Sequence, residues 1–328
     1  MKKCIYVFAC FILFALLLTS CVPMDATSYP ESTVNSQQES SSFETDSNPD
    51  NSKETETSIS QTSEVESEES LVNLKKYMKL HFIDVGQGDA IFIELPNKQC
   101  MLVDAGDTTS GTLVVNYIKN LGYTSIDYFV ATHPHTDHIG GLPAIFNAFQ
   151  VKSIYMPNAS NATSAYQNMM SVISNEKLTP ITVMDGIYII KTYNLQIEFL
   201  APNSNNYENL NNYSAVIKIT FENNIFLLMG DAEELSESEI TDNVQADVVK
   251  VGYHGGATAS TQNFVTHVSP KYAIISVGKN NTFGHPSADV IARWENSGAT
   301  VYRTDLYGTI VVTSDGLNID VESMTNTD

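Results

Sequence analysis

The sequence predicts one α/β domain at residues 76–328, behind a long polar segment. Two observations predict this fold class. Short apolar runs, often rich in β-branched residues, recur along the domain, and each ends in a polar or glycine-rich cluster, as strands commonly do. Fewer segments carry apolar residues at helical spacing. A stretch of about 250 residues is compatible with one two-layered domain.

Histidine and aspartate residues follow the ends of several predicted strands. The run at 126–132 ends at a histidine cluster, the run at 225–229 leads to Asp231, and the run at 248–251 leads to His254. Loops fixed by rigid strands are how a sheet presents a site, so we expect one catalytic edge. The eight predicted strands are 80–85, 90–95, 101–103, 126–132, 216–221, 225–229, 248–251 and 272–277.

Three segments are predicted to be helices. Residues 111–121 carry apolar side chains at helical spacing and are followed by Gly122, a residue that commonly ends helices. The other two predicted helices are 142–149 and 288–296.

Residues 1–20 have the pattern of a bacterial lipoprotein signal peptide. Lys2 and Lys3 precede an apolar run at 5–18, which is too short to span a bilayer comfortably, and Leu18-Thr19-Ser20-Cys21 resembles a lipobox. We expect cleavage before Cys21 and lipidation of Cys21, which would anchor the chain to the extracytoplasmic face of a bacterial membrane. An uncleaved anchor and an ordinary signal peptide are the alternatives.

Residues 21–75 are predicted to be a disordered tether behind the lipidated cysteine. Ser, Thr, Glu, Asn and Gln dominate, and residues 22–74 hold 12 acidic residues against one basic residue, Lys53. Such a segment buries too little apolar surface to offset the entropy of ordering. We expect it to lift the domain off the membrane.

The whole chain is acidic, with a formal net charge of −21. A basic face is the usual footprint of nucleic-acid binding, and none is evident in the sequence. Local patches or bound metal cations would still attract phosphate. The charge therefore weakens a nuclease interpretation without removing it, and no obligate protein partner is inferred.

A metal site is predicted at His133, His135, Asp137 and His138, which follow a predicted strand within six residues. Alternate side chains of an extended chain point the same way, so His133 and His135 can hold one ion. Asp137 and His138 then face a second position as the chain turns. Imidazole and carboxylate suit Zn²⁺ and tolerate Mn²⁺ or Fe. A cluster of surface histidines and a structural zinc are the alternatives.

This cluster carries a family resemblance. His133-Pro134-His135-Thr136-Asp137-His138 has the H-x-H-x-D-H signature of the metallo-β-lactamase superfamily, and the chain resembles the hydrolase domain of the ComEC/Rec2 competence family (ComA-like), here as a stand-alone lipoprotein. The resemblance implies an αβ/βα sandwich: two mixed sheets packed face to face, helices outside and metals at one edge. DNA uptake is not carried over. The matching stretches are 82–90, 103–106, 132–141, 229–233, 254–255 and 284–286.

The resemblance implies two divalent metal ions, most simply Zn²⁺ with Mn²⁺ as the alternative. Asp231 would bridge them and His254 would complete the second site. Asp231 follows an apolar strand, where an isolated charge is costly unless it is paired or metal-bound. Residues 139–253 contain no histidine, so the first metal would have only His133, His135, Asp231 and water.

Further residues are assigned to substrate on the same resemblance. The Asn-x-x-Ser element of the competence branch matches residues 211–214, which assigns Asn212 and Ser214 to substrate. Tyr253 stands where that branch has histidine, and its hydroxyl would reach a substrate oxygen. Asn281 and His285 would contact a phosphate or protonate the leaving group, with a loop-stabilising role as the equal alternative.

Two carboxylates are assigned to the support of the ligands. Asp104 would orient a ligand histidine from behind, with an ordinary turn residue as the alternative. Asp84 is placed in the same supporting layer.

The predicted function is hydrolysis of a phosphodiester, in nucleic acid or in a smaller phosphoester, by metal-activated water that Asp137 orients. A phosphorylcholine esterase and a lactonase or β-lactamase-like hydrolase are the catalytic alternatives. The third alternative is a non-catalytic binding lipoprotein with a degenerate metal site.

Overall fold

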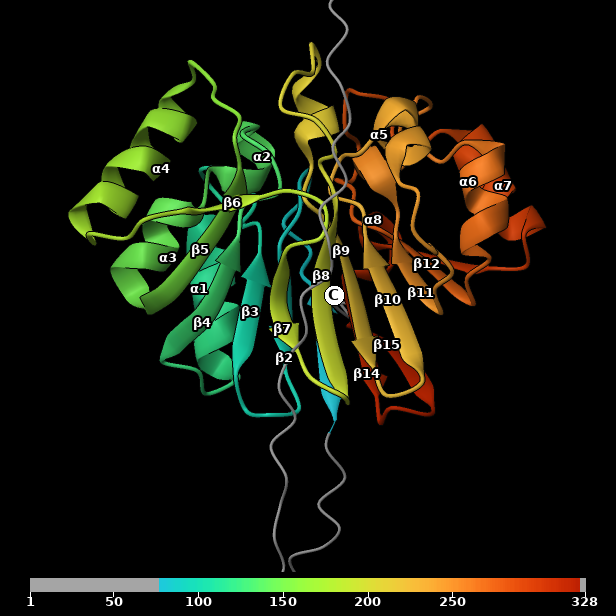
Figure 1. The fold of residues 1–328 in the computed structure, drawn as a ribbon, viewed down its shortest axis with the longest axis horizontal. Coiled ribbons are helices and arrows are strands. Elements are labelled where there is room, and N and C mark those ends of the chain that lie inside the picture. Colours follow the sequence, from blue (N-terminus) through green and yellow to red (C-terminus); the bar gives the residue numbers. More distant parts are fainter. Residues whose placement is uncertain (1–76, 325–328) are drawn as a thin grey trace, which may run out of the picture. The chain divides into compact units, whose positions relative to one another are not determined.

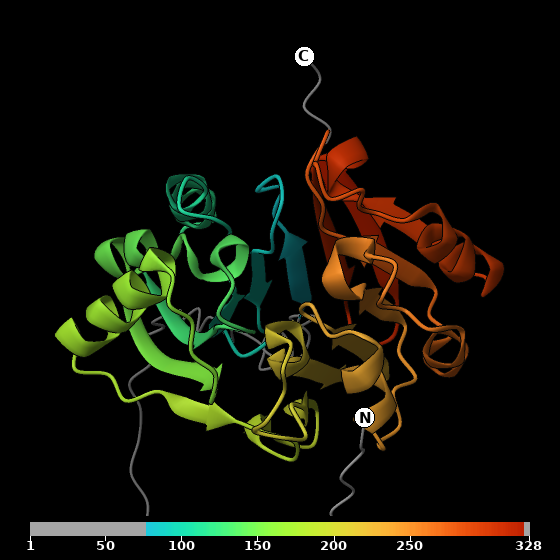
Figure 2. The ribbon, with the colours of Figure 1, turned by 90° about the horizontal axis from the view of Figure 1, so that it is seen from above.

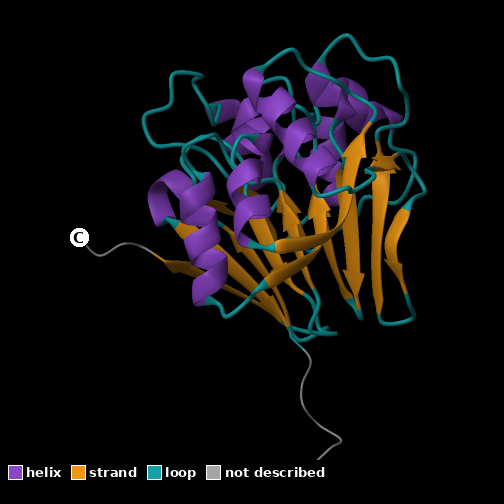
Figure 3. Cartoon of the chain, turned by 90° about the vertical axis from the view of Figure 1, so that its left-hand side faces the viewer, coloured by secondary structure: helices purple, strands orange, loops and turns teal. Residues whose placement is uncertain are grey.

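The computed structural model describes residues 77–324, in which two β-sheets lie face to face with helices on their outer faces (Figure 1; Figure 3). This arrangement confirms the predicted αβ/βα sandwich. The predicted signal peptide at 1–20, the tether at 21–75 and the lipidation site at Cys21 lie outside the described residues.

The first sheet has eight strands in the order β15-β14-β1-β2-β3-β4-β5-β6. It is mixed, because β3 to β6 run parallel to one another while the remaining neighbours are antiparallel. Its strands are β1 (Met78–Phe82), β2 (Ile91–Glu94), β3 (Cys100–Val103), β4 (Ser125–Val130), β5 (Gln150–Pro157), β6 (Ile181–Val183), β14 (Thr309–Ser314) and β15 (Ile319–Met324).

The second sheet has seven strands in the order β13-β12-β11-β10-β9-β8-β7 and is also mixed. Its strands β10 to β13 are parallel, and β7 to β10 form antiparallel pairs. They are β7 (Tyr188–Lys191), β8 (Leu195–Ala201), β9 (Val216–Phe221), β10 (Asn224–Leu228), β11 (Val248–Lys250), β12 (Tyr272–Ile275) and β13 (Thr300–Arg303).

The helices of the two halves cover opposite faces of the sandwich, as the view from above shows (Figure 2). Helices α1, α3 and α4 enclose one apolar cluster against the first sheet, and α6 and α7 enclose another against the second. No helix within residues 77–324 is long and apolar enough to cross a membrane. The helical segments are α1 (Gly111–Asn120), α2 (Thr136–Ile139), α3 (Leu142–Ala148), α4 (Ser164–Asn175), η2 (Leu210–Tyr213), α5 (Glu234–Glu239), η3 (Gly252–Gly255), α6 (Gln262–Val268), α7 (Ala288–Asn296) and α8 (Thr304–Tyr307).

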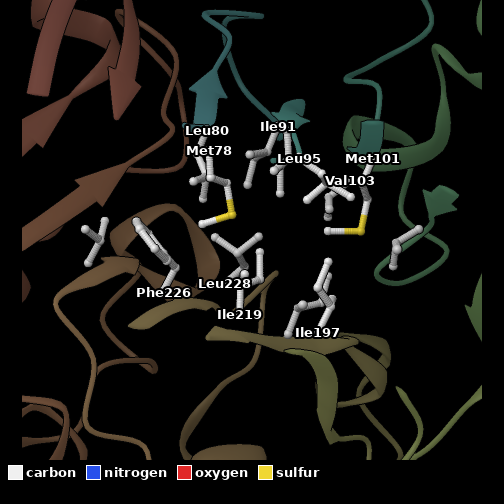
Figure 4. Close-up of a cluster of buried hydrophobic side chains, with 14 of the residues drawn as sticks. Met78, Leu80, Ile91, Leu95, Met101, Val103, Ile197, Ile219, Phe226 and Leu228 are labelled. Carbon is white, nitrogen blue, oxygen red and sulfur yellow. The ribbon is translucent and has the colours of Figure 1, made fainter. Parts of the chain in front are cut away.

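The core between the two sheets is apolar. Leu80 and Met101 from the first sheet face Ile197 and Phe226 from the second (Figure 4), and all four side chains are fully buried. Alternate residues of each strand point to this layer, while the others face the helices. Burial on both faces fixes the strands, and therefore the loops at their ends, in one position.

Several predicted strands are shorter in the structure than the sequence suggests, and two of them lead into the functional edge. The strand predicted at 80–85 ends at Phe82, and the strand predicted at 126–132 ends at Val130. In both cases one further backbone hydrogen bond follows the end of the strand, from Ile83 to Ala90 and from Ala131 to Tyr155. The residues beyond it leave the sheet and carry the polar loops of the functional edge.

Candidate metal centre

The predicted metal ligands come from three strand ends that meet at one edge of the sandwich. The histidine cluster follows β4 and runs into the short helix α2, whose residues include Asp137 and His138. Asp231 follows β10, and His254 lies in the turn η3 after β11. Because β10 and β11 are parallel neighbours, their carboxyl ends lie side by side.

Three imidazoles surround one oxygen of Asp231. The Oδ2 atom of Asp231 lies 3.2 Å from Nε2 of His138, 3.4 Å from Nε2 of His254 and 3.7 Å from Nε2 of His133. All four side chains are almost completely buried. Residues more than 100 positions apart in the sequence thus converge on one atom.

The donors divide into two groups that share Asp231. In the first, ligand atoms of His133, His135 and Asp231 lie within 4.8 Å of one another, and in the second the same holds for Asp137, His138 and His254. Asp231 also contacts the second group through the Nε2 atoms of His138 and His254. Asp137 Oδ2 is 3.4 Å from His254 Nε2, which closes the second group. This is the division that the sequence predicts.

The residues fit a pair of cations. His138 Nε2, His254 Nε2 and Asp231 Oδ1 are buried side-chain atoms that have no hydrogen-bond partner. A buried polar atom without a partner is costly, whereas a metal ion uses such lone pairs. Four imidazoles and two carboxylates also match the donor types that transition metals prefer.

The pKa values of the donors in the metal-free centre also reflect the close packing of imidazoles and carboxylates. Burial would lower the pKa values of His138 and His254, but the Asp231 carboxylate and its neighbours raise both well above the usual value. Burial and the nearby charge of His138 lower the pKa of His133 well below the usual value of histidine. The imidazoles outweigh the burial of Asp231 and keep its pKa well below the usual range.

Asp104 holds the His138 ring from behind. Its Oδ2 atom lies 2.8 Å from His138 Nδ1, and its two oxygens also accept hydrogen bonds from the backbone N–H and hydroxyl of Thr132. A carboxylate on Nδ1 leaves Nε2 free to bind metal and fixes the tautomer. The structure therefore places Asp104 where the sequence analysis assigned it.

A buried lysine and a second carboxylate complete the support, and the sequence analysis did not single them out. The Nζ atom of Lys250, in β11, forms an ion pair with Asp89, donates to the carbonyl of Gly230 at 2.9 Å and lies 4.0 Å from Asp231 Oδ1. Asp89 Oδ1 approaches His254 Nδ1 at 3.5 Å. Burial would raise the pKa of Asp89, but Lys250 and His254 hold it below the usual value.

A cavity of about 480 Å³ opens onto the donors. Asn211, Tyr253 and His285 line it, together with ligands of both groups. Its size is in the range of small-molecule sites. Tyr253 and His254 both have left-handed backbone conformations, with φ of +49° and +50°, and strain of this kind clusters at functional sites.

Comparison with known proteins assigns the family. The sequence profile of the metallo-beta-lactamase superfamily matches residues 83–279, which contain all six donors. The chain belongs to the metallo-beta-lactamase superfamily. With this fold and this donor set, it is a metal-dependent hydrolase.

Curated relatives within the superfamily are competence and recombination proteins. The chain is 28% identical over 252 residues to "ComE operon protein 3" of Bacillus subtilis (strain 168), covering 71% of the chain and 32% of that protein. It is 26% identical over 235 residues to "Competence protein ComA" of Neisseria gonorrhoeae, covering 69% and 31%. "Recombination protein 2" of Haemophilus influenzae is 26% identical over 236 residues, covering 70% and 28%. The chain spans about a third of the length of these relatives.

Three residues assigned from the superfamily pattern lie elsewhere than expected. Asn212 and Ser214 are buried and do not line the cavity: Asn212 Oδ1 accepts from the backbone of Ser236, and Ser214 Oγ accepts from the backbone N–H of Asp231 at 2.9 Å. Both support the ligand loop, and Asn211 takes the place at the cavity. Asp84 has no contact with a ligand histidine among the interactions of the described residues. The Nδ1 atom of His254 instead lies 3.0 Å from the carbonyl of Ser276 and 3.5 Å from Asp89 Oδ1.

Asn281 holds a loop. Its Nδ2 atom donates to the carbonyl of Gly278 at 3.0 Å, and its Oδ1 atom accepts from the backbone N–H groups of Phe283 and His285, both at 3.1 Å. The amide is therefore occupied within the loop, as the loop-stabilising alternative expects. His285, which this loop presents, does line the cavity.

Proposed function

We propose that the chain is a phosphodiesterase that uses metal-activated water and is held by a lipid on Cys21 at the outer face of a bacterial membrane. The observation that carries the catalytic part is the pair of donor groups that meet at Asp231 beside an open cavity. Paired metal sites are suited to phosphoester hydrolysis, because they stabilise both the attacking and the leaving oxygen. The names of the competence and recombination relatives favour a phosphodiester over a lactam or lactone.

Zn²⁺ is the metal we propose, with Mn²⁺ as the alternative. Four imidazoles and two carboxylates favour zinc. Bound cations would lower the pKa of a coordinated water and polarise the phosphoryl oxygen. His133, His135 and Asp231 would hold one ion, and Asp137, His138 and His254 with Asp231 would hold the other.

The remaining catalytic roles are assigned to Asp137, His285 and Tyr253. Asp137 is partly exposed and lines the cavity, so its carboxylate can accept a hydrogen bond from the attacking water and orient it. Burial and the neighbouring His254 lower the pKa of His285, which is therefore neutral near pH 7 and can donate one N–H to a phosphate or leaving-group oxygen. The hydroxyl of Tyr253 supplies a further donor at the same cavity.

Substitution of the shared carboxylate tests the mechanism. We expect Asp231→Ala and Asp137→Ala to abolish hydrolysis of bis-p-nitrophenyl phosphate and to lower the metal content per chain. Asp320→Ala, which removes an exposed carboxylate on the edge strand β15, is the matched control. Wild-type turnover in Asp231→Ala would refute the mechanism.

A substrate panel separates the reaction classes. Bis-p-nitrophenyl phosphate, single-stranded DNA, a cephalosporin and a lactone are offered to the purified chain with Zn²⁺ or Mn²⁺. We expect turnover of a phosphodiester, and turnover confined to the cephalosporin or lactone would replace the proposal. Fewer than one ion per chain with no turnover would favour a non-catalytic binding protein.

The membrane tether needs its own test. Labelling cells with a radioactive fatty acid should mark the wild-type chain and not Cys21→Ser, and Cys21→Ser should leave the membrane fraction. Protease added to intact protoplasts should degrade the wild-type domain. Label on Cys21→Ser, or protection from protease, would contradict the proposed location.

A further inference from the structure

Four hairpin turns lie at the end of the sandwich opposite the metal donors (Figure 1). Strands β1 and β10 begin at this end, and the loops that follow them carry Asp89 and Asp231 to the metal centre. The turns enclose a cavity of about 800 Å³, which the proposed hydrolysis does not use. We call it the hairpin groove, and it is lined by the turns at 96–97, 192–194, 221–223 and 315–317.

Hydrogen bonds fix the turns of the hairpin groove to one another. The Nδ2 atom of Asn194 donates to Glu222 Oε1 at 2.8 Å, and the backbone N–H of Glu222 donates to the Asn194 carbonyl at 2.9 Å. The backbone N–H of Asn223 donates to the Gly316 carbonyl at 2.9 Å, which joins a turn of the second sheet to a turn of the first. The groove is therefore preformed.

Large side chains are exposed in this groove beside buried ones. Leu195 and Phe221 line it and are buried, whereas Tyr193 and Leu317 line it with 98% and 68% of their surface exposed. The turn that presents Tyr193 is held by Thr192, whose hydroxyl donates to the Leu195 carbonyl at 2.9 Å. Exposed apolar side chains gathered at a concave surface are typical of an interaction site.

The hairpin groove is also acidic. Glu222 and Asp315 line it, and none of the described residues that line it is lysine or arginine. A positively charged segment is therefore favoured there over a negatively charged one. Residues 22–70 carry 12 acidic residues against one lysine, so this part of the chain does not suit the groove.

The residues that directly precede the described part of the chain have the complementary composition. Residues 71–76 read Leu-Val-Asn-Leu-Lys-Lys, with three aliphatic side chains followed by two positive charges. No other four consecutive residues between 22 and 76 hold three aliphatic side chains. Aliphatic side chains match the exposed apolar residues of the groove, and the lysines match its acidic residues.

The register of β1 brings this segment to the groove. Met78 is paired with Ser314 of β14, and the next residue, Asp315, lines the groove. Tyr77 therefore lies at its edge. Six extended residues span roughly 20 Å, whereas two packed sheets lie about 10 Å apart. Residues 71–76 are thus long enough to cross the groove from one sheet to the other.

We propose that residues 71–76 fill the hairpin groove, with their aliphatic side chains against Tyr193 and Leu317 and their lysines beside the two acidic residues. The folded domain then begins at Leu71 and not at residue 76. The tether leaves the domain at the end opposite the metal donors.

A double-mutant cycle in the full chain tests the contact. The Tm of the metal-free protein is measured by circular dichroism for Leu74→Ser, Leu317→Ser and the double variant. An empty groove would leave the Tm of Leu317→Ser within roughly 2 °C of the wild type, because an exposed side chain contributes little. We expect each single variant to lower the Tm by roughly 4–8 °C, and the double variant to lose little more than one of them.

Ile59→Ser is the matched control, because it removes an aliphatic side chain of the tether outside residues 71–76. It should leave the Tm unchanged, and its effect should add to that of Leu317→Ser.

The rate of thiol alkylation is a second, independent measurement. The chain carries Cys4→Ser, Cys10→Ser and Cys21→Ser, which leaves the buried Cys100 in every sample. We expect Leu74→Cys to react on the order of tenfold more slowly than Ser60→Cys, because the groove covers it. Adding Tyr193→Ala and Leu317→Ser should restore the faster rate.

Three results would overturn the proposal. The first is additive Tm losses for Leu74→Ser and Leu317→Ser, and the second is equal alkylation rates for Leu74→Cys and Ser60→Cys. The third is protection of Leu74→Cys that appears only at concentrations at which sedimentation detects a dimer, because the segment of a second copy would then fill the groove.

Discussion

Replacing Lys250 with methionine should destabilise the domain strongly. Lys250 is completely buried in β11, and its ammonium group is paired with Asp89 and hydrogen-bonded to the Gly230 carbonyl. Methionine fits the same space but removes the charge and the donor. Asp89, itself 1% exposed, would then be a buried carboxylate that has lost its nearest cation.

The expected loss is about 3–5 kcal/mol in the free energy of unfolding, since removing one partner of a buried ion pair leaves the other uncompensated. For a domain of this size each kcal/mol lowers Tm by roughly 2–4 °C, so the fall should be roughly 6–20 °C. Adding Asp89→Asn should recover part of the loss, because the uncompensated charge disappears.

Urea and thermal unfolding of the metal-free chain, followed by circular dichroism, measure the effect. Lys271→Met is the matched control, since Lys271 is 67% exposed and its 3.0 Å pair with Asp247 lies at the surface. It should cost no more than about 1 kcal/mol. A loss below about 1 kcal/mol in Lys250→Met, or no coupling with Asp89→Asn, would refute the account of this pair.

Four further predictions concern the ligand loops and the metal donors. Gly88→Ala should lower both Tm and metal content, because its Cβ would lie 2.2 Å from the Asp137 carbonyl oxygen at a φ of +125°; an unchanged variant would show that this close approach is unimportant. Asp104→Asn should weaken zinc binding by roughly 10–100-fold in isothermal titration, and unaltered affinity would remove Asp104 from the support of His138. Zinc affinity should rise with pH, by up to about 100-fold per unit through the neutral range, because binding must displace protons from His138 and His254, whose pKa values are raised; a flat profile would contradict this. The same raised pKa values stabilise the metal-free fold below a pH of about 6.5, and this contribution is lost as the pH rises through the folded-state values, as urea unfolding at several pH values would show.

Apolar runs predicted several interior strands, although β5, β8 and β14, which also lie inside the sheets, were not predicted. The predicted strand 216–221 and the predicted helix 288–296 coincide with β9 and α7. Segments with mixed surfaces were missed. Helix α4 (Ser164–Asn175) buries only a few of its residues and exposes polar ones, and β15 (Ile319–Met324) is an edge strand with little burial. Their structure depends on neighbours that a single sequence window does not contain.

His133, His135, Asp137 and His138 could be predicted as metal donors because their residue types and spacing are specific to metal chemistry, whereas Asp231 and His254 were predicted from the family resemblance. The supporting pair Asp89 and Lys250 was missed, although a signal existed: Lys250 interrupts the apolar run Val248-Val249-Lys250-Val251, and a charge inside a buried strand requires a partner. The sequence alone does not show which carboxylate that partner is. In the same way, the choice between Asn211 and Asn212 at the cavity depends on the direction of the η2 turn, which composition does not specify.

The central claim is that two cations share the carboxylate of Asp231. A crystal structure of the chain grown with zinc, with anomalous scattering recorded at the zinc absorption edge, tests it directly. We predict two anomalous peaks, one against His133 and His135 and the other against His138 and His254, both in contact with Asp231. A single peak, or peaks that do not touch Asp231, would contradict the account.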